Sequence, residues 1–371
     1  MKLIITGDLV INKKYPLENI SQEVIDLFQN SDYNIVNLEA PVTESKRKII
    51  KTGPHLKANK KSTTQVLKSL NIDLVTLANN HVLDYDEQGV LDTLQFCKEI
   101  KIATVGAEKN KEEASKIFYL DSQEGKIAII NIAENEWASA AENKAGANGM
   151  DLIDDIKNIQ KAKTQSDYVF VIVHGGHEYY HLPSPRMQKQ YRFYVDNGAD
   201  MVVGHHTHYI SGSEEYKGKH IYYSLGNFLF TNSSSFENWY LGLLLEVEIK
   251  NGKLTPQLHP IKQEKESFEL SLLNAIEKQE VLNHILDYDR IIADSDKLKR
   301  EWDIYVESKY ESYLNLWSPV SFIENHYLKA AFNKLRIRIL NKKGIALKLN
   351  LLRCEAHANM SKEVIEKYLR K

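Results

Sequence analysis

Acidic, amide and imidazole side chains gather in six short segments of this chain, and each segment follows directly after an apolar run. The six segments are Gly7-Asp8, Asn37-Leu38-Glu39, Ala78-Asn79-Asn80-His81, His174-Gly175-Gly176-His177-Glu178, Gly204-His205-His206-Thr207-His208 and Ser224-Leu225-Gly226-Asn227-Phe228. In α/β proteins, the loops at the carboxyl ends of the strands hold the ligand-binding residues. We therefore expect these segments to supply the residues of a functional site.

These side chains have the donor types of a divalent metal site. Zn, Mn and Fe accept mixed oxygen and nitrogen ligands from carboxylates, carbonyls and imidazoles. The predicted ligands are Asp8, Glu39, Asn80, His174, His206 and His208. The set suffices for one ion or two, with one carboxylate able to bridge a pair. Two ions about 3.5–4 Å apart would clamp a substrate oxygen and lower the pKa of a bound water.

His81 and Asp84 are the predicted catalytic residues. His81 follows Asn80 directly and is free to protonate a leaving oxygen or to stabilise negative charge that develops on it. Asp84 lies a few residues further on and can orient the His81 ring. The residues predicted to position the substrate are His177, Glu178, His205 and Asn227.

The individual segments differ in how strongly they indicate a metal. A Gly-Asp pair after a strand is also a common turn or helix cap, so Asp8 alone is weak evidence. The three histidines between residues 204 and 208 are the strongest indication, because burying several unpaired imidazoles would be costly. The alternative is a histidine-rich surface turn that binds metal adventitiously.

Short apolar runs alternate with segments of helical spacing along the first two-thirds of the chain, which predicts an α/β sheet fold. The runs are residues 3–6, 33–38, 74–77, 103–105, 127–132, 168–173 and 201–203. Residues 64–70 and 89–100 are predicted crossover helices. Strands at 240–249 and 254–261 are predicted to form a hairpin around Asn251-Gly252.

The predicted catalytic domain covers residues 1–262, and residues 263–371 are predicted to form a helical C-terminal extension, which is basic toward its end. From Ala331 to Lys371 the chain has 11 Lys or Arg against three Glu. The basic residues include Lys334, Arg336, Arg338, Lys342, Lys343, Lys348 and Arg353. This segment is either a solvated helix face or a surface that docks to membrane headgroups, a partner or an anionic polymer.

The composition argues against several classes of protein. Lys plus Arg number 48 against 50 Asp plus Glu, so the net charge of -2 gives no general attraction for nucleic acid, and no nucleic-acid partner is expected. Two distant cysteines cannot form a disulfide framework. No segment has the pattern of a signal peptide or the roughly 20 apolar residues of a membrane span. We therefore expect a cytoplasmic protein, with membrane association through the basic segment left open.

Six ordered motifs give the chain a specific family resemblance. They are TGDLV, NLEAPV, LANNHVLDY, HGGHEY, GADMVVGHHTHYISG and YYSLGNF. Over residues 1–262 the chain resembles the CapA family, which is named for bacterial poly-γ-glutamate capsule synthesis and is related to calcineurin-like metallophosphoesterases. The resemblance implies a four-layer α/β/β/α sandwich of two mixed sheets flanked by helices.

The resemblance also implies a role for each matching residue. Asp8 matches the first metal aspartate, Glu39 the bridging carboxylate, Asn80 and His81 the Asn-His pair, His174 the lone histidine, and His206 with His208 the closing His-x-His. Two positions depart from the phosphoesterase pattern, because Val10 stands in place of a histidine and Glu39 in place of an aspartate. We therefore expect a single ion, or a second ion that binds weakly. Glu178 and Tyr179 resemble the family's His-x-Gly-x-Glu-Tyr element and could compensate as ligand or substrate contact.

These observations support two hypotheses of different classes. The first is a metallophosphoesterase-like hydrolase of capsule, exopolysaccharide or poly-γ-glutamate biosynthesis, in which metal-activated water attacks a phosphoester, or an amide or ester, of an anionic polymer or phosphorylated precursor. The alternative is a non-catalytic polymer-binding or assembly component of a capsule synthesis or export complex. In either case, the basic C-terminal helices could hold the protein at a membrane or within a complex.

Overall fold

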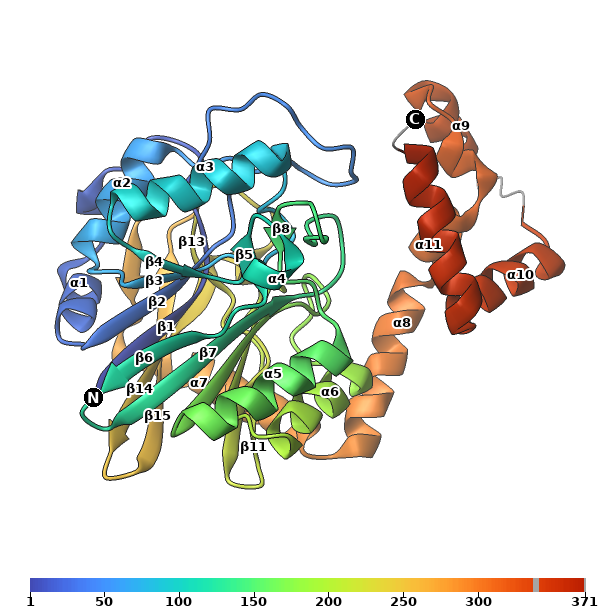
Figure 1. The fold of residues 1–371 in the computed structure, drawn as a ribbon. Coiled ribbons are helices and arrows are strands. Elements are labelled where there is room, and N and C mark those ends of the chain that lie inside the picture. The colour runs from blue at the N-terminus through green and yellow to red at the C-terminus, as the bar shows by residue number, and fades with distance from the viewer. Residues whose placement is uncertain (336–339, 370–371) are drawn as a thin grey trace. The chain divides into compact units, whose positions relative to one another are not determined.

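The computed structural model of the chain describes residues 1–335 and 340–369. The chain forms two compact units, Met1–Leu298 and Lys299–Lys371 (Figure 1). The boundary that the sequence predicts after residue 262 lies inside the first unit, at the end of a long strand, and stays a prediction. All predicted site residues belong to the first unit.

The first sheet has eight strands in the order β16-β15-β14-β1-β2-β3-β4, with β13 paired to the end of β1. Their bounds are β1 Lys2–Val10, β2 Tyr33–Leu38, β3 Leu74–Thr76, β4 Ala103–Val105, β13 Asn227–Phe230, β14 Leu241–Lys250, β15 Lys253–Gln263 and β16 Leu270–Leu272. Strands β1 to β4 are parallel, whereas β14 to β16 are antiparallel to their neighbours. The predicted hairpin is confirmed, since Asn251 and Gly252 join β14 to β15 with φ angles of 51° and 75°.

The second sheet has six strands in the order β11-β12-β10-β9-β7-β6. Their bounds are β6 Phe118–Ser122, β7 Gly125–Ala133, β9 Tyr168–His174, β10 Met201–His205, β11 Ser213–Tyr216 and β12 Lys219–Tyr222. Strands β7, β9, β10 and β12 are parallel, and β6 and β11 are antiparallel edge strands. A separate pair, β5 (Ala107–Glu108) with β8 (Gly146–Ala147), completes the strands.

The two sheets pack face to face, and helices cover both outer faces. Because side chains alternate along a strand, Leu3 and Ile5 of β1 lie in the core between the sheets with Phe170 of β9, whereas Ile4 lies in the outer core. That outer core contains the buried faces of α1 (Gln22–Gln29), α2 (Lys60–Ser69) and α3 (Asp86–Glu99). The short helix α4 (Lys111–Ala114) follows β5.

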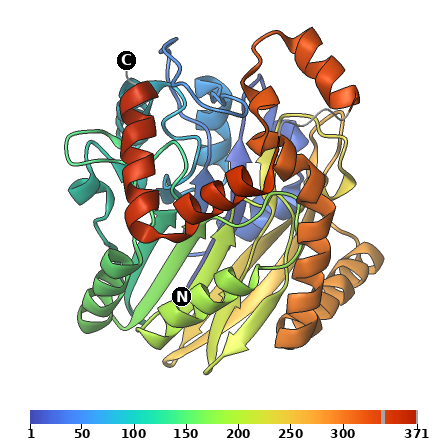
Figure 2. The same cartoon turned by 90° about the vertical axis from the view of Figure 1, so that its right-hand side faces the viewer.

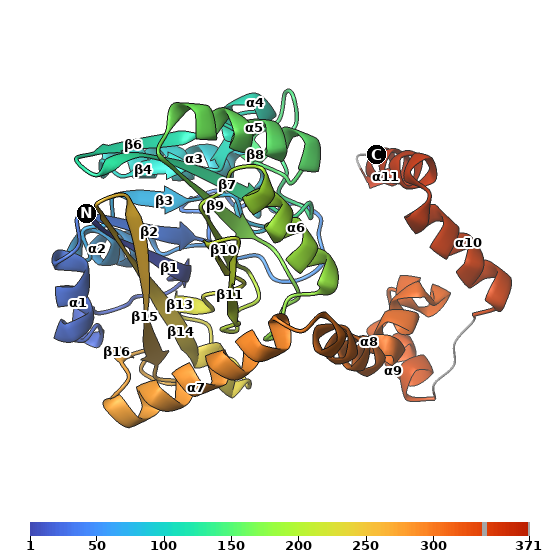
Figure 3. The same cartoon turned by 90° about the horizontal axis from the view of Figure 1, so that it is seen from below.

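The second sheet has its own outer core, which contains residues of α5 (Leu152–Gln165) and α6 (Pro185–Asp196). Both helices begin at a capping side chain: Asp151 accepts hydrogen bonds from the backbone N–H groups of Ile153 and Asp154, and Ser184 accepts one from Met187. Figures 1 and 3 show helices on the two outer sides, and Figure 2 shows α5 and α6 (green) alongside the strands of the second sheet. The predicted four-layer α/β/β/α sandwich is confirmed.

The predicted helical C-terminal region is also present, and β16 precedes it. It consists of α7 (Ala275–Ile292), α8 (Ser295–Trp317), α9 (His326–Lys334), α10 (Lys342–Arg353) and α11 (Glu355–Leu369). Asn274 and Glu277 form a capping box at the start of α7. Arg336 and Arg338 of the basic segment lie outside the described residues. Within residues 1–335 and 340–369, no helix is long and apolar enough to cross a membrane.

Candidate metal centre

The predicted ligands come together because strands of both sheets end at the same place. Asp8 lies near the end of β1, Glu39 follows β2, and Asn80 follows β3 in the first sheet. In the second sheet His174 ends β9, and the loop after β10 carries His206 and His208. All six side chains are buried, with exposed fractions of 8% or less.

His174 lies at the centre of one group of ligand atoms. Its Nε2 is 3.0 Å from Oδ1 of Asn80, 3.1 Å from Nδ1 of His206 and 3.5 Å from Oε1 of Glu39. Asn80 Oδ1 and the Glu39 carboxylate can only accept, and a single hydrogen on Nε2 can satisfy only one of them. A cation among these atoms would satisfy all of them at once.

Asp8 and His208 form a second group with Glu39. Ligand atoms of these three residues lie within 4.8 Å of one another, and Oδ2 of Asp8 is 3.5 Å from Nδ1 of His208. The Asp8 carboxylate is held in place by Asn37, whose Nδ2 donates to Oδ1 over 2.6 Å, and by the backbone N–H of His206, which donates to Oδ2 over 3.1 Å. Asn37 was not assigned a role from the sequence.

Glu39 is common to both groups and is the least satisfied side chain of the site. It is fully buried, and neither carboxylate oxygen has a hydrogen-bond partner among the residues that the structure describes. Burying an unpaired carboxylate is costly unless a proton or a cation neutralises it. Burial, together with the charges of Asp8 and Glu178, raises the pKa of Glu39 well above its usual value. The donor set and this orphaned carboxylate fit a divalent cation.

The other ligands show the same effect of burial. Burial raises the pKa of Asp8 to about 7, although its hydrogen bonds from Asn37 and His206 oppose the shift. The pKa of His206 falls to about 3 and that of His208 to about 4, chiefly through burial. The imidazoles are therefore neutral at physiological pH, which is the form that binds a metal.

The loop after β10, which we call the ligand loop, has a disfavoured backbone conformation at two of the predicted ligands. His206 and His208 have φ angles of 82° and 59°, in the left-handed region that non-glycine residues rarely adopt. Such angles typically cost about 1–3 kcal/mol each and tend to occur at functional sites. This turn places the imidazole of His206 near Glu39 and that of His208 near Asp8 and Glu39, and the backbone conformation that it requires is energetically unfavourable.

His81 is paired with Asp84, as predicted. Its Nδ1 lies 2.7 Å from Oδ2 of Asp84, which also accepts a hydrogen bond from the backbone N–H of Leu56 over 2.6 Å. Lys51, absent from the predicted set, forms an ion pair with Asp84 and has its Nζ 3.1 Å from Nδ1 of His81. Burial is the main cause of the lowered pKa of His81. No strand or helix pattern surrounds Lys51, so its sequence context gave no signal.

The residues predicted to contact substrate have different surroundings. His205 is buried, and its Nε2 donates to the backbone oxygen of Thr6 over 2.8 Å, which places it beside β1. Asn227 lies 3.0 Å from Nδ1 of His208 through its Oδ1 and thereby orients that ring. Glu178 is exposed and His177 is half-buried, and burial lowers the pKa of His177. Their contact with substrate stays a prediction.

Two further residues near the predicted ligands were given no role in the sequence analysis. Oε1 of Glu136, in the loop after β7, lies 3.6 Å from Nε2 of His206. Asn79, next to Asn80, donates through Nδ2 to the backbone oxygen of Leu38 over 2.9 Å and ties the loops after β2 and β3 together. Val10 is buried in the outer core, so it supplies no ligand in place of the expected histidine.

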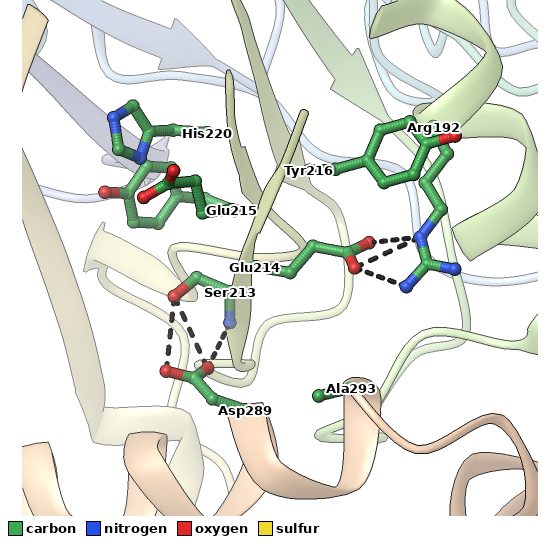
Figure 4. Close-up of a pocket in the computed structure, with 9 residues that line it drawn as sticks. Arg192, Ser213, Glu214, Glu215, Tyr216, His220, Asp289 and Ala293 are labelled. Carbon is green, nitrogen blue, oxygen red and sulfur yellow. Dashed lines mark hydrogen bonds and ion pairs between the residues drawn. The ribbon is translucent and has the colours of Figure 1, made fainter. Parts of the chain in front are cut away.

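A surface pocket of about 480 Å³ lies elsewhere in the first unit (Figure 4). Its residues include Arg192, Glu214, Ser213 and Asp289, and Nε of Arg192 is 3.1 Å from both carboxylate oxygens of Glu214. Figure 4 shows Arg192 paired with Glu214, and Asp289 bound by hydrogen bonds from Ser213. None of the predicted site residues lines this pocket.

Comparisons with known proteins identify the family and several relatives of the chain. A family model described as "Bacterial capsule synthesis protein PGA_cap" matches residues 2–232. The chain is 32% identical over 246 residues to the "Capsule biosynthesis protein CapA" of Bacillus anthracis, covering 62% of this chain and 60% of that protein. It is 38% identical over 218 residues to the "PGA biosynthesis protein CapA" of Bacillus subtilis (strain 168), covering 57% of each. The chain thus spans about three-fifths of these relatives.

Among solved structures, a hypothetical protein from Thermus thermophilus aligns with a TM-score of 0.45 at 15% identity, covering 70% of this chain and 99% of that one.

Proposed function

Because this chain belongs to the bacterial capsule synthesis protein family PGA_cap, we propose that it is a metal-dependent hydrolase of capsule or poly-γ-glutamate biosynthesis. Two relatives named for capsule or PGA biosynthesis support the biological role. The substrate would be an anionic polymer or a phosphorylated precursor, and the protein would act within a capsule synthesis complex. The bond attacked would be a phosphoester, or an amide or ester.

One observation carries the chemical part of the proposal, namely the buried and unpartnered carboxylate of Glu39 between two groups of ligands. Glu39, Asn80, His174 and His206 would hold one ion, and Asp8, Glu39 and His208 a second. The second set has fewer ligands, since Val10 lies in the core, so its ion would bind more weakly. A bound divalent ion would supply Lewis acidity and a water of lowered pKa.

The remaining roles belong to the chain's own residues. His81 would donate a proton or a hydrogen bond to the leaving oxygen, and Asp84 would hold its ring through the 2.7 Å contact at Nδ1. Asn227 would fix the orientation of His208, and Asn37 that of Asp8. Glu178, His177 and His205 remain candidates for positioning the substrate.

Turnover of bis(4-nitrophenyl) phosphate with added Mn²⁺ tests the proposal. We expect hydrolysis by the unmodified protein and its loss in Glu39→Gln. The matched control is Glu246→Gln on β14, a partly buried carboxylate that contacts Lys2 and His259 outside the site. If the metal-loaded protein turns over neither this diester nor ester and amide substrates, the non-catalytic alternative, a polymer-binding or assembly component, replaces the hydrolase.

We also propose that the second unit contacts an anionic membrane surface. Met360, Val364 and Tyr368 recur every four residues along α11 and have exposed fractions of 64%, 58% and 76%. Lys342 and Lys343 begin α10 and are exposed. Exposed apolar residues at helical spacing together with lysines suit an interfacial helix better than a purely polymer-binding surface.

A further inference from the structure

Aromatic side chains line the metal centre on the side of His208. The ring of Trp239 lies 4.6 Å from that of His208, and the ring of Tyr179 lies 6.1 Å from it. Tyr179 in turn contacts Phe236, with ring centroids 4.9 Å apart. We call Tyr179, Phe236 and Trp239 the aromatic wall. It leads outward from a proposed metal ligand to the protein surface.

Exposure differs sharply along the aromatic wall. Trp239 is 7% exposed and packs against Phe230, with ring centroids 4.7 Å apart, so it is part of the hydrophobic core. Tyr179 is half-buried, and Phe236 is 48% exposed. The outer pair therefore offers aromatic surface to solvent beside the ligands. An exposed phenylalanine alone is ordinary, but one packed at a tilt against a residue that borders the proposed metal centre is not.

Tyr179 is held in place by the ligand loop itself. Its φ angle of 63° is in the left-handed region, which a bulky side chain rarely adopts. Its backbone N–H donates to the backbone oxygen of Thr207 over 2.9 Å, and Thr207 lies between the ligands His206 and His208. The same loop thus sets both the ligands and the tyrosine, and a disfavoured conformation at such a position indicates a functional constraint.

Because the wall consists of aromatic side chains, it favours binding of some chemical groups over others. Aromatic faces bind planar rings by stacking, and saturated rings through their apolar faces. A chain of free carboxylates gains nothing from such a surface. The wall therefore suits a substrate that carries a ring.

We propose that Tyr179 and Phe236 form a subsite that binds the face of a ring in the substrate, next to the bond presented to the metal centre. The inference rests on the proposed hydrolase function and adds the class of substrate. It assigns a specificity-determining role to Phe236, which lies outside every motif of the sequence analysis. A planar ring such as a nucleobase and a saturated ring such as a sugar share the required chemistry.

The test compares phosphonates that the protein cannot hydrolyse. Calorimetric titration of the Mn²⁺-loaded full chain with methylphosphonate measures anion binding at the metals. Phenylphosphonate and cyclohexylphosphonate then add a planar or a saturated ring to the same anion. We expect at least one of these to bind about fivefold more tightly than methylphosphonate, and the arm with the larger gain identifies the ring type.

Phe236→Ala should remove the ring preference and leave metal content and methylphosphonate binding unchanged. The matched control is Phe193→Ala, which removes a phenylalanine of similar exposure, 42%, from α6. Equal affinity for all three phosphonates, or a preference for the ring-bearing phosphonates that persists in Phe236→Ala, would contradict the ring subsite but not the proposed function. If no phosphonate binds to the metal-loaded protein, the proposed function fails together with it.

Discussion

Replacing Glu39 by Gln should affect the metal-free and the metal-loaded protein in opposite directions. Without metal, the Glu39 carboxylate is buried and has no hydrogen-bond partner among the described residues. A buried group left unsatisfied costs about 1–3 kcal/mol, and a charged group more. Gln keeps the shape and carries no charge, but its buried amide is also left unpaired, so the metal-free variant should be more stable at pH 8 by the difference between a charged and a neutral unsatisfied group, about 1–3 kcal/mol.

The pH dependence follows from the direction of the pKa shift. The pKa of Glu39 is raised in the folded protein, so the folded state holds this proton more tightly than the unfolded chain does. The destabilisation by Glu39 is therefore absent below the unfolded pKa of about 4.3 and grows as the pH rises above it. The stability gain of Glu39→Gln should shrink toward zero near pH 4.

Thermal unfolding in a chelator, and then with Mn²⁺, measures both effects. Unfolding entropy of about 2.1 cal/mol/K per residue gives roughly 0.6 kcal/mol/K for the first unit, so 1–3 kcal/mol corresponds to about 2–5 °C in Tm. Metal at 100 times its Kd should add about 2.7 kcal/mol to the unmodified protein and much less to the variant. Glu246→Gln is the control. A Glu39→Gln protein that is less stable in chelator at pH 8 would refute the reasoning.

Three further predictions concern the His81 pair, the proton balance and the second unit. His81→Gln should lower kcat by about 10²-fold or more with metal content unchanged, as measured by turnover beside elemental analysis; lost metal would instead make His81 a ligand. Because burial raises the pKa of both Asp8 and Glu39, Mn²⁺ binding should release protons, and more of them at pH 6 than at pH 8. Calorimetry in buffers of different ionisation enthalpy measures this release, and a heat independent of buffer at pH 6 would contradict it. Val364→Asp should weaken sedimentation of the full chain with anionic vesicles, whereas a variant that sediments like the unmodified protein would exclude α11 from membrane contact.

The strands could be predicted from local patterns in the sequence, whereas the four-layer order was implied by the family resemblance, and the ligand set stays a prediction. Apolar runs predict the strands, and polar residues directly after them predict a shared edge, which is where Asp8, Glu39 and His174 lie. Lys51 and Phe236 could not be found this way, since each lies in a loop and reaches the site only through tertiary contacts. The β16 strand was also missed, because three residues are too few to show a period.

The proposal that Glu39 lies between two ion positions is tested most directly by metal content. Untagged protein, incubated anaerobically with Mn²⁺, Zn²⁺ or Fe²⁺ and freed of excess metal, is analysed by elemental mass spectrometry beside Asp8→Ala and His206→Ala. We predict at least one ion per chain in the unmodified protein and in the Glu246→Gln control, a clear loss of that ion in His206→Ala, and loss of any second ion in Asp8→Ala. An unmodified protein that retains no ion under any of these conditions would contradict the metal centre and the hydrolase proposal with it.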